Sequence, residues 1–269
     1  MNTDVFDLYP GTRPLLVSLP HVGTRIPPEL RSAFVARALQ VEDTDWHLDQ
    51  LYEFTRAIGA SLLKPQISRY VIDLNRPPDD TPMYPGASNT ELCPTRFFTG
   101  DPLYRDGAAP EPVERARRCE QYWQPYHAAL QGELNRIKEQ HGFALLWDAH
   151  SIRSEIPWLF EGRLPDLNIG TANGQAAGAS ITAAVAAACA DAPGVTSAVN
   201  GRFKGGYITR RYGNPALRVH AVQLEKCQCI YMQERTPFAY DPGKAAAIGP
   251  VLQAMVSAGL NAARALHER

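Results

Sequence analysis

Short apolar runs alternate along this chain with longer segments in which apolar residues recur at helical spacing. The short runs predict strands at 14–20, 60–64, 68–75, 143–150 and 219–226. The longer segments predict helices at 41–61, 111–142, 174–192 and 241–268, and the glycine-rich stretch 198–215 is typical of a hairpin or loop. Strands separated by helices predict an α/β fold, a three-layer α/β/α arrangement with a mainly parallel or mixed central sheet.

Two segments interrupt this alternation. Helix 111–142 contains Pro125, which predicts a kink, and Gly142 follows its last turn and predicts where it stops. Residues 77–110 are rich in Pro, Gly, Asp and Thr, and so long an irregular excursion is more typical of a functional loop than of a simple connection. We find no repeat and expect residues 1–269 to form a single domain that includes this excursion.

Polar side chains stand at the ends of four predicted strands. They are His21, the pair Asn75 and Arg76, the pair Asp148 and His150, and Glu225. In open α/β sheets ligands bind outside the carboxyl ends of the strands. A single histidine in such a place is usually an ordinary turn residue, but four polar clusters in the same topological position favour a functional site.

Two of these residues, His21 and His150, are histidines suited to a metal. Two histidines and a carboxylate, with water in the remaining position, form a hydrolytic zinc site. We therefore expect one divalent metal ion, with zinc as the expected ion, although His₂-carboxylate sites accept several divalent ions.

The third ligand must come from elsewhere, and the start of helix 41–61 offers Asp43, Asp45 and His47. We choose Asp45 because it lies nearest the direction of the helix's core face, with His47 second and Asp43 pointing well away. That face is defined by Leu48, Leu51, Tyr52 and Thr55. The alternative stays open that these residues only cap the helix and favour its dipole.

Asp148 and Glu225 complete the predicted site. On a strand Asp148 shares a face with His150, so it either ligates the metal directly or orients His150 from behind, and we favour the second role. Glu225 would act as the general base toward a metal-bound water and then protonate the leaving amine. The alternative for Glu225 is a structural ion pair with Lys226 or an arginine.

Arginines gather in the same segments, and their forked guanidinium groups match carboxylates. They are Arg69, Arg76, Arg153, Arg202, Arg210 and Arg211. We select Arg76, because it stands at a strand end, and Arg210 and Arg211, because they lie in a glycine-rich segment that would allow a mobile lid. We expect at least two of the six to be ordinary solvated loop residues.

Composition narrows the class of protein. The chain has 269 residues, 45% of them hydrophobic, and a net charge of −1 with no long basic run, which argues against nucleic-acid binding. No apolar stretch approaches the roughly 20 residues of a membrane span, and the acidic N-terminus is unlike a signal peptide. Five scattered cysteines are expected to be reduced, which favours the cytoplasm. Nothing in the sequence specifies an oligomeric state.

Taken together, these residues resemble the N-formylglutamate amidohydrolases, also called N-formylglutamate deformylases, over about residues 14–235. The blocks that carry the resemblance are SLPHVGTRIP, DTDWHLDQLY, SRYVIDLNRPPDD, LLWDAHSIRSEIPWLFEGRLPDLNIGT, GRFKGGYITRRYGNP and VQLEKCQCIYM. That family is similar to the zinc carboxypeptidases and aspartoacylase-like enzymes, which implies a zinc-exopeptidase (phosphorylase/hydrolase-like) fold for this chain.

The resemblance also implies roles. DAHS implies that His150 binds zinc, IDLNRP implies that Asn75 and Arg76 hold the substrate carboxylate, and Glu225 stands where the wider group has its catalytic glutamate. The wider group's first metal motif is His-x-x-Glu, whereas here His21 is followed by Val-Gly-Thr. The third ligand therefore rests on the helical geometry, with Asp45 preferred over His47 and Asp148.

The implied reaction is hydrolysis of N-formyl-L-glutamate to formate and L-glutamate, a late step of histidine degradation. A dianionic substrate would need two cationic clamps, which Arg76 and the Arg210/Arg211 pair would supply. The alternative is a related metal-dependent hydrolase of N-acyl amino acids or small peptides. A non-catalytic binding protein is disfavoured because His21, His150 and Glu225 are all present, and a serine hydrolase because GxSxG is absent.

Overall fold

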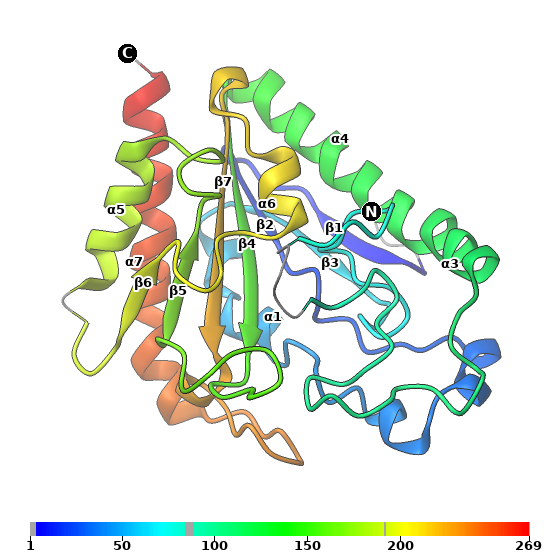
Figure 1. Cartoon of the computed structure of the whole chain (residues 1–269). Coiled ribbons are helices and arrows are strands. Elements are labelled where there is room, and N and C mark those ends of the chain that lie inside the picture. Colours follow the sequence, from blue (N-terminus) through cyan, green and yellow to red (C-terminus); the bar gives the residue numbers. More distant parts are fainter. Residues whose placement is uncertain (1–3, 84–88, 191, 269) are drawn as a thin grey trace.

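A mixed seven-stranded sheet forms the centre of the computed structural model, which describes residues 4–83, 89–190 and 192–268 (Figure 1). The strand order is β1-β3-β2-β4-β7-β5-β6. The inner strands β3, β2, β4 and β7 are parallel, whereas β1 and β5 run antiparallel to their neighbours β3 and β7. The strands are β1 Phe6–Tyr9, β2 Leu15–Ser18, β3 Ser61–Pro65, β4 Ala144–Ile152, β5 Leu167–Gly170, β6 Ser197–Val199 and β7 Val219–Cys227.

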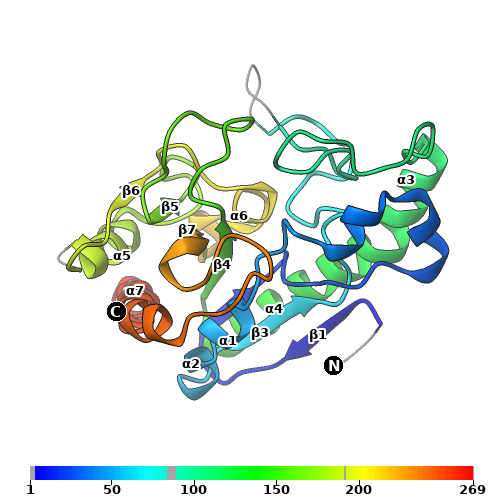
Figure 2. The same ribbon diagram turned by 90° about the horizontal axis from the view of Figure 1, so that it is seen from below.

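Helices cover both faces of the sheet, with α5 and α7 on one side and α3 and α4 on the other (Figures 1 and 2). The α-helices are α1 Leu48–Leu51, α2 Phe54–Ala57, α3 Pro112–Arg118, α4 Gln124–His141, α5 Ala179–Ala190, α6 Tyr207–Tyr212 and α7 Pro242–His267. A π-helical turn, η3 Cys119–Trp123, joins α3 to α4, and the 3₁₀ turns are η1 Pro28–Ala33, η2 Ala36–Gln40, η4 Pro215–Leu217 and η5 Gln228–Ile230. The α/β class and the mixed, two-sided sheet are therefore confirmed.

Alternate residues of the central strands enter two separate cores. On β4, Leu146 packs in the core beneath α4, whereas Leu145 and Trp147 pack in the core beneath α5 and α7. Because side chains alternate across a strand, the residues two and four positions after Leu146 point to the same face of the sheet as Leu146. Asp148 and His150 therefore share one face of the sheet, as the sequence predicts.

The predicted elements differ from the structure in three places. Segment 41–61 is not one helix, because Val41 (φ 46°) and His47 (φ 61°) are left-handed and a right-handed helix begins only at Leu48. Residues 68–75 are not a strand; they form turns whose apolar side chains are buried without sheet pairing. Segment 198–215 is not a hairpin; it contains a loop that leads into α6. In addition, β1, β5 and β6 have no counterpart among the predicted strands.

The long predicted helix 111–142 is continuous but contains the π-turn, which ends two residues before Pro125. Proline lacks an N–H donor, and a wider turn accommodates its ring in a helix interior. The helix stops at Gly142, whose φ of 78° is left-handed and whose N–H donates to the Lys138 carbonyl. The expected stop at Gly142 is therefore confirmed, and a π-turn lies beside the residue where the kink is expected.

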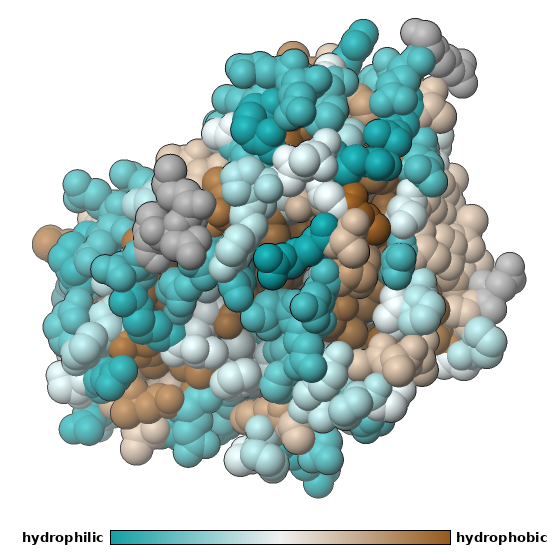
Figure 3. All heavy atoms as spheres, turned by 180° about the vertical axis from the view of Figure 1, so that it is seen from behind, coloured by the Kyte–Doolittle hydropathy of each residue, from teal (hydrophilic) through white to brown (hydrophobic). Residues whose placement is uncertain are grey.

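Helix α7 is long and apolar enough to cross a membrane, by length and composition alone. Its apolar side chains, among them Leu252 and Met255, are buried in the core beneath α5 and the sheet. A core helix passes the same test of length and hydropathy. On the face turned away in Figure 1, hydrophilic and apolar side chains are interspersed (Figure 3).

Candidate metal centre and active-site cavity

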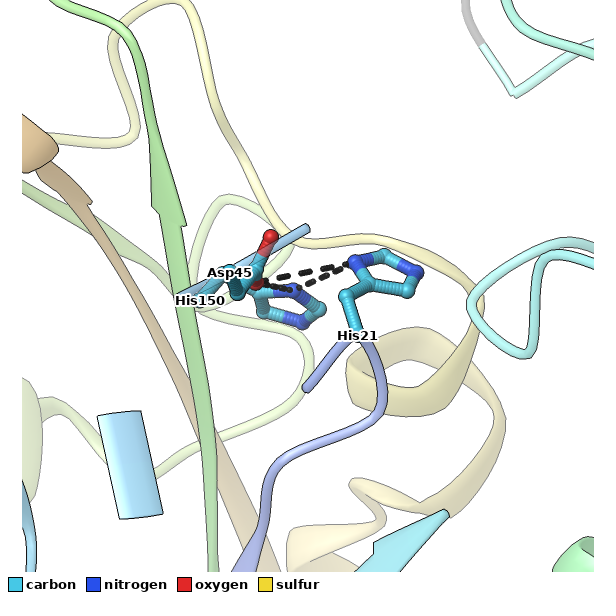
Figure 4. A group of neighbouring side chains, drawn as sticks. All are labelled: His21, Asp45 and His150. Atoms are coloured by element: carbon cyan, nitrogen blue, oxygen red, sulfur yellow. Dashed lines mark hydrogen bonds and ion pairs between the residues drawn. The ribbon is translucent and has the colours of Figure 1, made fainter. Parts of the chain in front are cut away.

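His21, Asp45 and His150 converge outside the carboxyl ends of β2 and β4 (Figure 4). The two imidazole Nδ1 atoms lie 3.2 Å apart, and Asp45 Oδ2 lies 3.4 Å from Nδ1 of His150 and 3.7 Å from Nδ1 of His21. All three residues are buried. In the described part of the chain this is the one group of three or more His, Cys, Asp or Glu side chains with such mutual spacing.

The local fold explains this convergence. Parallel pairing sets Ser18 of β2 beside Asp148 of β4, so the chain that leaves β2 brings His21 to the end of β4, where His150 stands. The Asp45 N–H donates to the His21 carbonyl, and the Ser151 N–H donates to Asp45 Oδ2. Asp45 is therefore held by backbone contacts from both sides, in a turn and not on the helix that we expected.

A carboxylate stands behind each histidine. His21 Nε2 lies 2.7 Å from Asp73 Oδ1, and His150 Nε2 lies 3.1 Å from Asp148 Oδ2. Each carboxylate accepts a hydrogen bond from an Nε2–H group, which leaves Nδ1 of each ring directed toward the other ring. Asp148 thus lies where a supporting residue would lie, while Asp73 was not among the predicted site residues.

Three electron-pair donors that face one another at such distances repel unless a cation lies between them. The electrostatics of the residues agree: burial opposes a charge on His150, yet Asp148 and Asp45 raise its pKa to about 10. The histidines likewise hold the pKa of Asp45 below its usual value despite its burial. Asp45 Oδ1 has no hydrogen-bond partner although it is buried. The residues therefore fit a bound metal ion.

A cavity of about 600 Å³, its open mouth included, lies over this group. Glu225 lines it from β7, directly across the ladder from His150, and its Oε1 is buried without a hydrogen-bond partner. Burial raises the pKa of Glu225 to about 7. The other lining residues include Arg69, Asn75, Arg76, Thr90, Phe98, Ser151, Ile152, Leu159, Arg202, Phe203, Gly206 and Gln223. Thr90 and Phe98 belong to the predicted excursion 77–110, in which residues 84–88 lie outside the described residues.

Arg69 is a buried cation inside this acidic group. It donates to Asp73 Oδ2 at 2.8 Å and lies 3.7 Å from Asp45 Oδ1. The Phe98 ring lies against its guanidinium, 4.7 Å from centroid to Cζ. Arg69 thus offsets two carboxylates that would otherwise repel each other. A signal for this pair was present in the sequence, because Asp73 stands two residues before Asn75 and four after Arg69.

Asn75 joins the group of His21, Asp45 and His150 to the start of α6. Its Oδ1 accepts from the Ile208 N–H at 2.8 Å, which orients the amide so that Nδ2 donates toward Gln223 Oε1 at 3.5 Å and lies beside the His150 ring. The Gly206 N–H donates to Gln223 Oε1 at 2.7 Å. A Cβ on Gly206 would come within 2.3 Å of Asn75 Nδ2, so only glycine permits this close approach.

The predicted arginines are distributed unevenly. Arg76 lines the cavity and donates to Thr90 and to the Asn75 carbonyl. Arg210 and Arg211 stand in the last turn of α6, where they are exposed and do not line the cavity, so the structure does not bring them to the site. Arg202, which we did not select, does line it. The sequence predicts a hairpin or loop over 198–215, whereas α6 forms there and carries residues 210 and 211 away from the cavity.

His47 and Asp43, the other two ligand candidates of segment 41–47, make their contacts away from His21 and His150. His47 Nε2 contacts the Phe238 carbonyl, 2.8 Å away. Asp43 binds Arg153, the Tyr70 hydroxyl and the Phe98 N–H, so it supports the excursion and not the histidines. Arg153 is accordingly a structural partner of Asp43.

Ring nitrogens of Trp123 and His127 form hydrogen bonds with backbone carbonyls of the segment Leu74–Arg76. Trp123, in the π-turn, donates from Nε1 to the Arg76 carbonyl at 3.0 Å, and His127 Nε2 lies 2.9 Å from the Leu74 carbonyl. The two rings stack with centroids 3.7 Å apart. The contacts bracket Asn75, and π-turns occur frequently beside functional sites.

Comparison with known proteins gives one consistent result. A family model described as N-formylglutamate amidohydrolase matches residues 13–232. The chain is 50% identical over 254 residues to an N-formylglutamate deformylase of Pseudomonas putida, covering 94% of this chain and 95% of that protein. It is 49% identical over 253 residues to the N-formylglutamate deformylase of Pseudomonas aeruginosa, covering 94% and 95%.

Solved structures agree with this result. An N-formylglutamate amidohydrolase from Ralstonia eutropha JMP134 superposes with a TM-score of 0.80 at 25% identity, over 99% of each chain. A structure from Agrobacterium tumefaciens superposes with a TM-score of 0.72 at 17% identity, over 96% of this chain and 95% of the other. The second likeness concerns the fold alone.

Proposed function

The chain belongs to the N-formylglutamate amidohydrolase family, and we propose that it hydrolyses N-formyl-L-glutamate to formate and L-glutamate with the help of a divalent metal ion. One observation carries this proposal: His21, Asp45, His150 and Glu225 meet in one cavity. We further propose that the chain is a single hydrolase domain that acts in histidine degradation in the cytoplasm.

His21, Asp45 and His150 would hold the metal, for which two imidazoles and one carboxylate favour zinc. When bound, the metal would polarise the formyl carbonyl and lower the pKa of an attacking water. Asp73 and Asp148 would keep the imidazoles in the tautomer that offers Nδ1, and Arg69 would limit the repulsion between the carboxylates.

Glu225 would move the proton. A carboxyl whose pKa is raised to about 7 exists in both forms near neutral pH, so it can accept a proton from water and pass it to the departing amide nitrogen. Breaking the carbon–nitrogen bond then leaves formate and the amino group of glutamate. Its place across the ladder from His150 supports this role.

Asn75 and Arg76 would hold the substrate's α-carboxylate. That carboxylate is attached to the carbon that bears the reacting amide nitrogen, so its binding group must lie close to the metal group. Asn75 contacts His150, and Arg76 follows it at the cavity wall. Guanidinium groups bind carboxylates through paired hydrogen bonds.

Formate release tests the proposal directly. Purified protein is depleted of metal, resupplied with zinc or another divalent ion, and given N-formyl-L-glutamate, N-formyl-L-aspartate or N-acetyl-L-glutamate. We expect metal-dependent release of formate from N-formyl-L-glutamate, with much slower turnover of the other two. An enzyme that releases no formate with any ion contradicts the proposal, while equal turnover of the acetyl compound favours a general N-acyl-amino-acid hydrolase.

A further inference from the structure

Gln223 is a buried polar side chain of the cavity that has no part in the metal site or in the proton transfer described above. It lines the cavity and is only 3% exposed. We propose that its side-chain amide donates from Nε2 to the α-carboxylate of the substrate and thereby selects derivatives of α-amino acids. The inference rests on the proposed function and deepens it, because it adds a substrate-binding residue that the sequence analysis did not select.

Gln223 stands on β7 and points to the same face of the sheet as Glu225. Ala221 packs in the core beneath α4, whereas Val222 and Leu224 pack in the opposite core. Because side chains alternate along a strand, Gln223 and Glu225 point to the face of Ala221. The β4 side chains of the candidate metal site point to this face as well. Gln223 is therefore part of the wall on which the reaction would take place.

Hydrogen bonds at one end of the amide fix its orientation. The Gly206 N–H donates to Gln223 Oε1 at 2.7 Å, and Asn75 Nδ2 donates to the same atom at 3.5 Å. Both donors need an acceptor, so these contacts place the oxygen at this end of the side chain and the nitrogen at the other. The amide is thus held through Oε1, which leaves Nε2 to bind another group.

The nitrogen end of this amide has no acceptor within the protein. Among the described residues, no group accepts a hydrogen bond from Gln223 Nε2, although the side chain is buried. The atom still reaches accessible surface, and this surface belongs to the cavity because the side chain lines it. Buried amide donors normally have an acceptor, so an oriented donor that lacks one in a cavity wall indicates a ligand-binding group.

The neighbours of Gln223 indicate which part of the substrate it meets. Asn75, which donates to Gln223 Oε1, precedes Arg76, and these two residues would hold the α-carboxylate. On its other side Gln223 stands two residues before Glu225, which would act at the reacting amide. The α-carboxylate is three covalent bonds from the formyl carbon, whereas the side-chain carboxylate is five bonds away. A donor beside both Asn75 and Glu225 therefore meets the α-carboxylate first.

Arg76 leaves hydrogen-bonding positions of that carboxylate unfilled. Its Nε and Nη2 donate to Thr90, and its Nη1 donates to the Asn75 carbonyl. One N–H then remains on each Nη atom, whereas a carboxylate accepts about four hydrogen bonds. A neutral amide adds donors without placing another cation beside the metal. Gln223 Nε2 supplies such a donor.

Two substitutions separate a substrate donor from a structural role. Gln223→Glu keeps an acceptor for the Gly206 N–H but removes the donor, and Gln223→Met keeps the length of the side chain but removes both. We expect Gln223→Met to lower kcat/KM for N-formyl-L-glutamate on the order of 10- to 100-fold through a higher KM. Gln223→Glu should lower it further, because its carboxylate repels that of the substrate. A purely structural role predicts the reverse order, with activity retained in Gln223→Glu.

Two controls exclude other causes of a lower activity. Metal content should be unchanged in both Gln223 variants, because neither substitution removes a proposed metal ligand. Gln253→Glu makes the same change on the exposed side of α7 and should leave kcat and KM at their wild-type values.

Substrates that lack one carboxylate identify the group that Gln223 binds. N-formyl-γ-aminobutyrate lacks the α-carboxylate, and N-formyl-L-glutamine lacks the side-chain carboxylate. Gln223→Met should weaken N-formyl-L-glutamine as much as N-formyl-L-glutamate and leave N-formyl-γ-aminobutyrate unchanged. For a substrate that turns over slowly, its inhibition constant against N-formyl-L-glutamate hydrolysis gives the same comparison.

Three results would overturn the inference. They are an equal loss for all three substrates, a loss confined to the two substrates that carry the side-chain carboxylate, and wild-type kinetics in Gln223→Glu. If the wild-type enzyme releases no formate from any of the three, the proposed function itself is contradicted, so the two failures are distinguishable.

Discussion

The cavity is built from two halves that are held in different ways. The strand-borne half consists of His150, Gln223 and Glu225, which project from β4 and β7. The loop-borne half consists of residues outside the strands, namely His21, Asp45, Arg69, Asn75, Arg76 and Arg202. Ladder pairing fixes the first half, because His150 and Glu225 are Cα partners in one parallel ladder. Hydrogen bonds outside the strand ladders, many of them made by side chains, fix the second.

This difference predicts how each half responds to amino-acid substitution. In the strand-borne half a changed side chain leaves the backbone in place, because backbone groups carry the pairing. In the loop-borne half each functional group is held by a buried polar partner, and deletion of such a partner costs on the order of 1–3 kcal/mol. Strand variants should therefore lose chemistry alone, whereas loop variants should lose positioning as well.

The largest effect is expected in the strand-borne half. Glu225→Gln removes the group that we propose accepts and returns the proton, while it keeps the shape of the side chain. We expect kcat to fall on the order of 10²- to 10⁴-fold, with melting temperature and metal content unchanged. Steady-state kinetics beside metal analysis measures this, and a kcat within a factor of three of wild type would remove Glu225 from the mechanism.

Acid should loosen the loop-borne half through His127, which holds the Leu74 carbonyl. Burial lowers the pKa of His127 from 6.5 to about 4. Between these values the unfolded chain binds a proton that the folded chain does not, so stability falls as the pH drops from about 6.5 to 4. The loss from this histidine approaches roughly 3 kcal/mol below the folded pKa.

Denaturant unfolding at several pH values measures this effect. His127→Gln should flatten the dependence and keep a donor for the Leu74 carbonyl. A matched control is His220→Gln, since burial also lowers the pKa of His220, at the start of β7, to about 4. Hydrogen exchange near Leu74 should become faster in acid in wild type and in His220→Gln. This acid effect should be smaller in His127→Gln. If the dependence of the unfolding free energy on pH is the same in both variants as in wild type, these two histidines are not buried in the neutral form.

Asp148 and Asp73, the carboxylates that bond to His150 and His21, form a matched pair across the two halves. Asp148→Asn and Asp73→Asn should each weaken metal affinity or activity by roughly 10- to 100-fold, because each removes the partner of one imidazole. Asp73→Asn should be the worse variant, because Asp73 also accepts from Arg69 and from the Asn75 N–H. If metal titrations show equal losses of affinity in the two variants, the additional contacts of Asp73 with Arg69 and Asn75 do not contribute to metal binding.

The smallest effect is expected from Trp123→Phe. The variant keeps an aromatic ring but loses the N–H that donates to the Arg76 carbonyl, a contact of about 1 kcal/mol. We expect a KM roughly five-fold higher with kcat nearly unchanged, since only the substrate loop shifts. Trp147→Phe is the control, because it loses a similar bond to Tyr52 in the opposite core and should affect stability alone.

The same two halves explain how far the sequence can predict this molecule. β4 and β7 are long apolar runs that end in polar groups, so period-two alternation and the rule for α/β sheets predict where His150 and Glu225 lie. The class of the fold and the long helices follow from the same patterns. These predictions depend on local periodicity, which the tertiary structure preserves.

The loop-borne half depends on contacts between residues far apart in the sequence, which no local pattern encodes. Asp45 was selected from the face of a helix that does not form there, and it reaches His21 through backbone bonds across the fold. Asp73 lies in an apolar run that resembles a strand but forms turns. Arg202 lines the cavity and Arg210 does not, because α6 forms in a segment that resembles a loop.

Metal content per chain tests the central claim that His21, Asp45 and His150 together hold one metal ion. Wild type, Asp45→Ala, His150→Ala and Glu225→Gln are purified in parallel with zinc, and bound metal is measured after dialysis, with circular dichroism as a check of folding. We expect about one equivalent in wild type and in Glu225→Gln, and little in folded Asp45→Ala and His150→Ala. Full metal retention in either alanine variant would contradict the proposed ligand set.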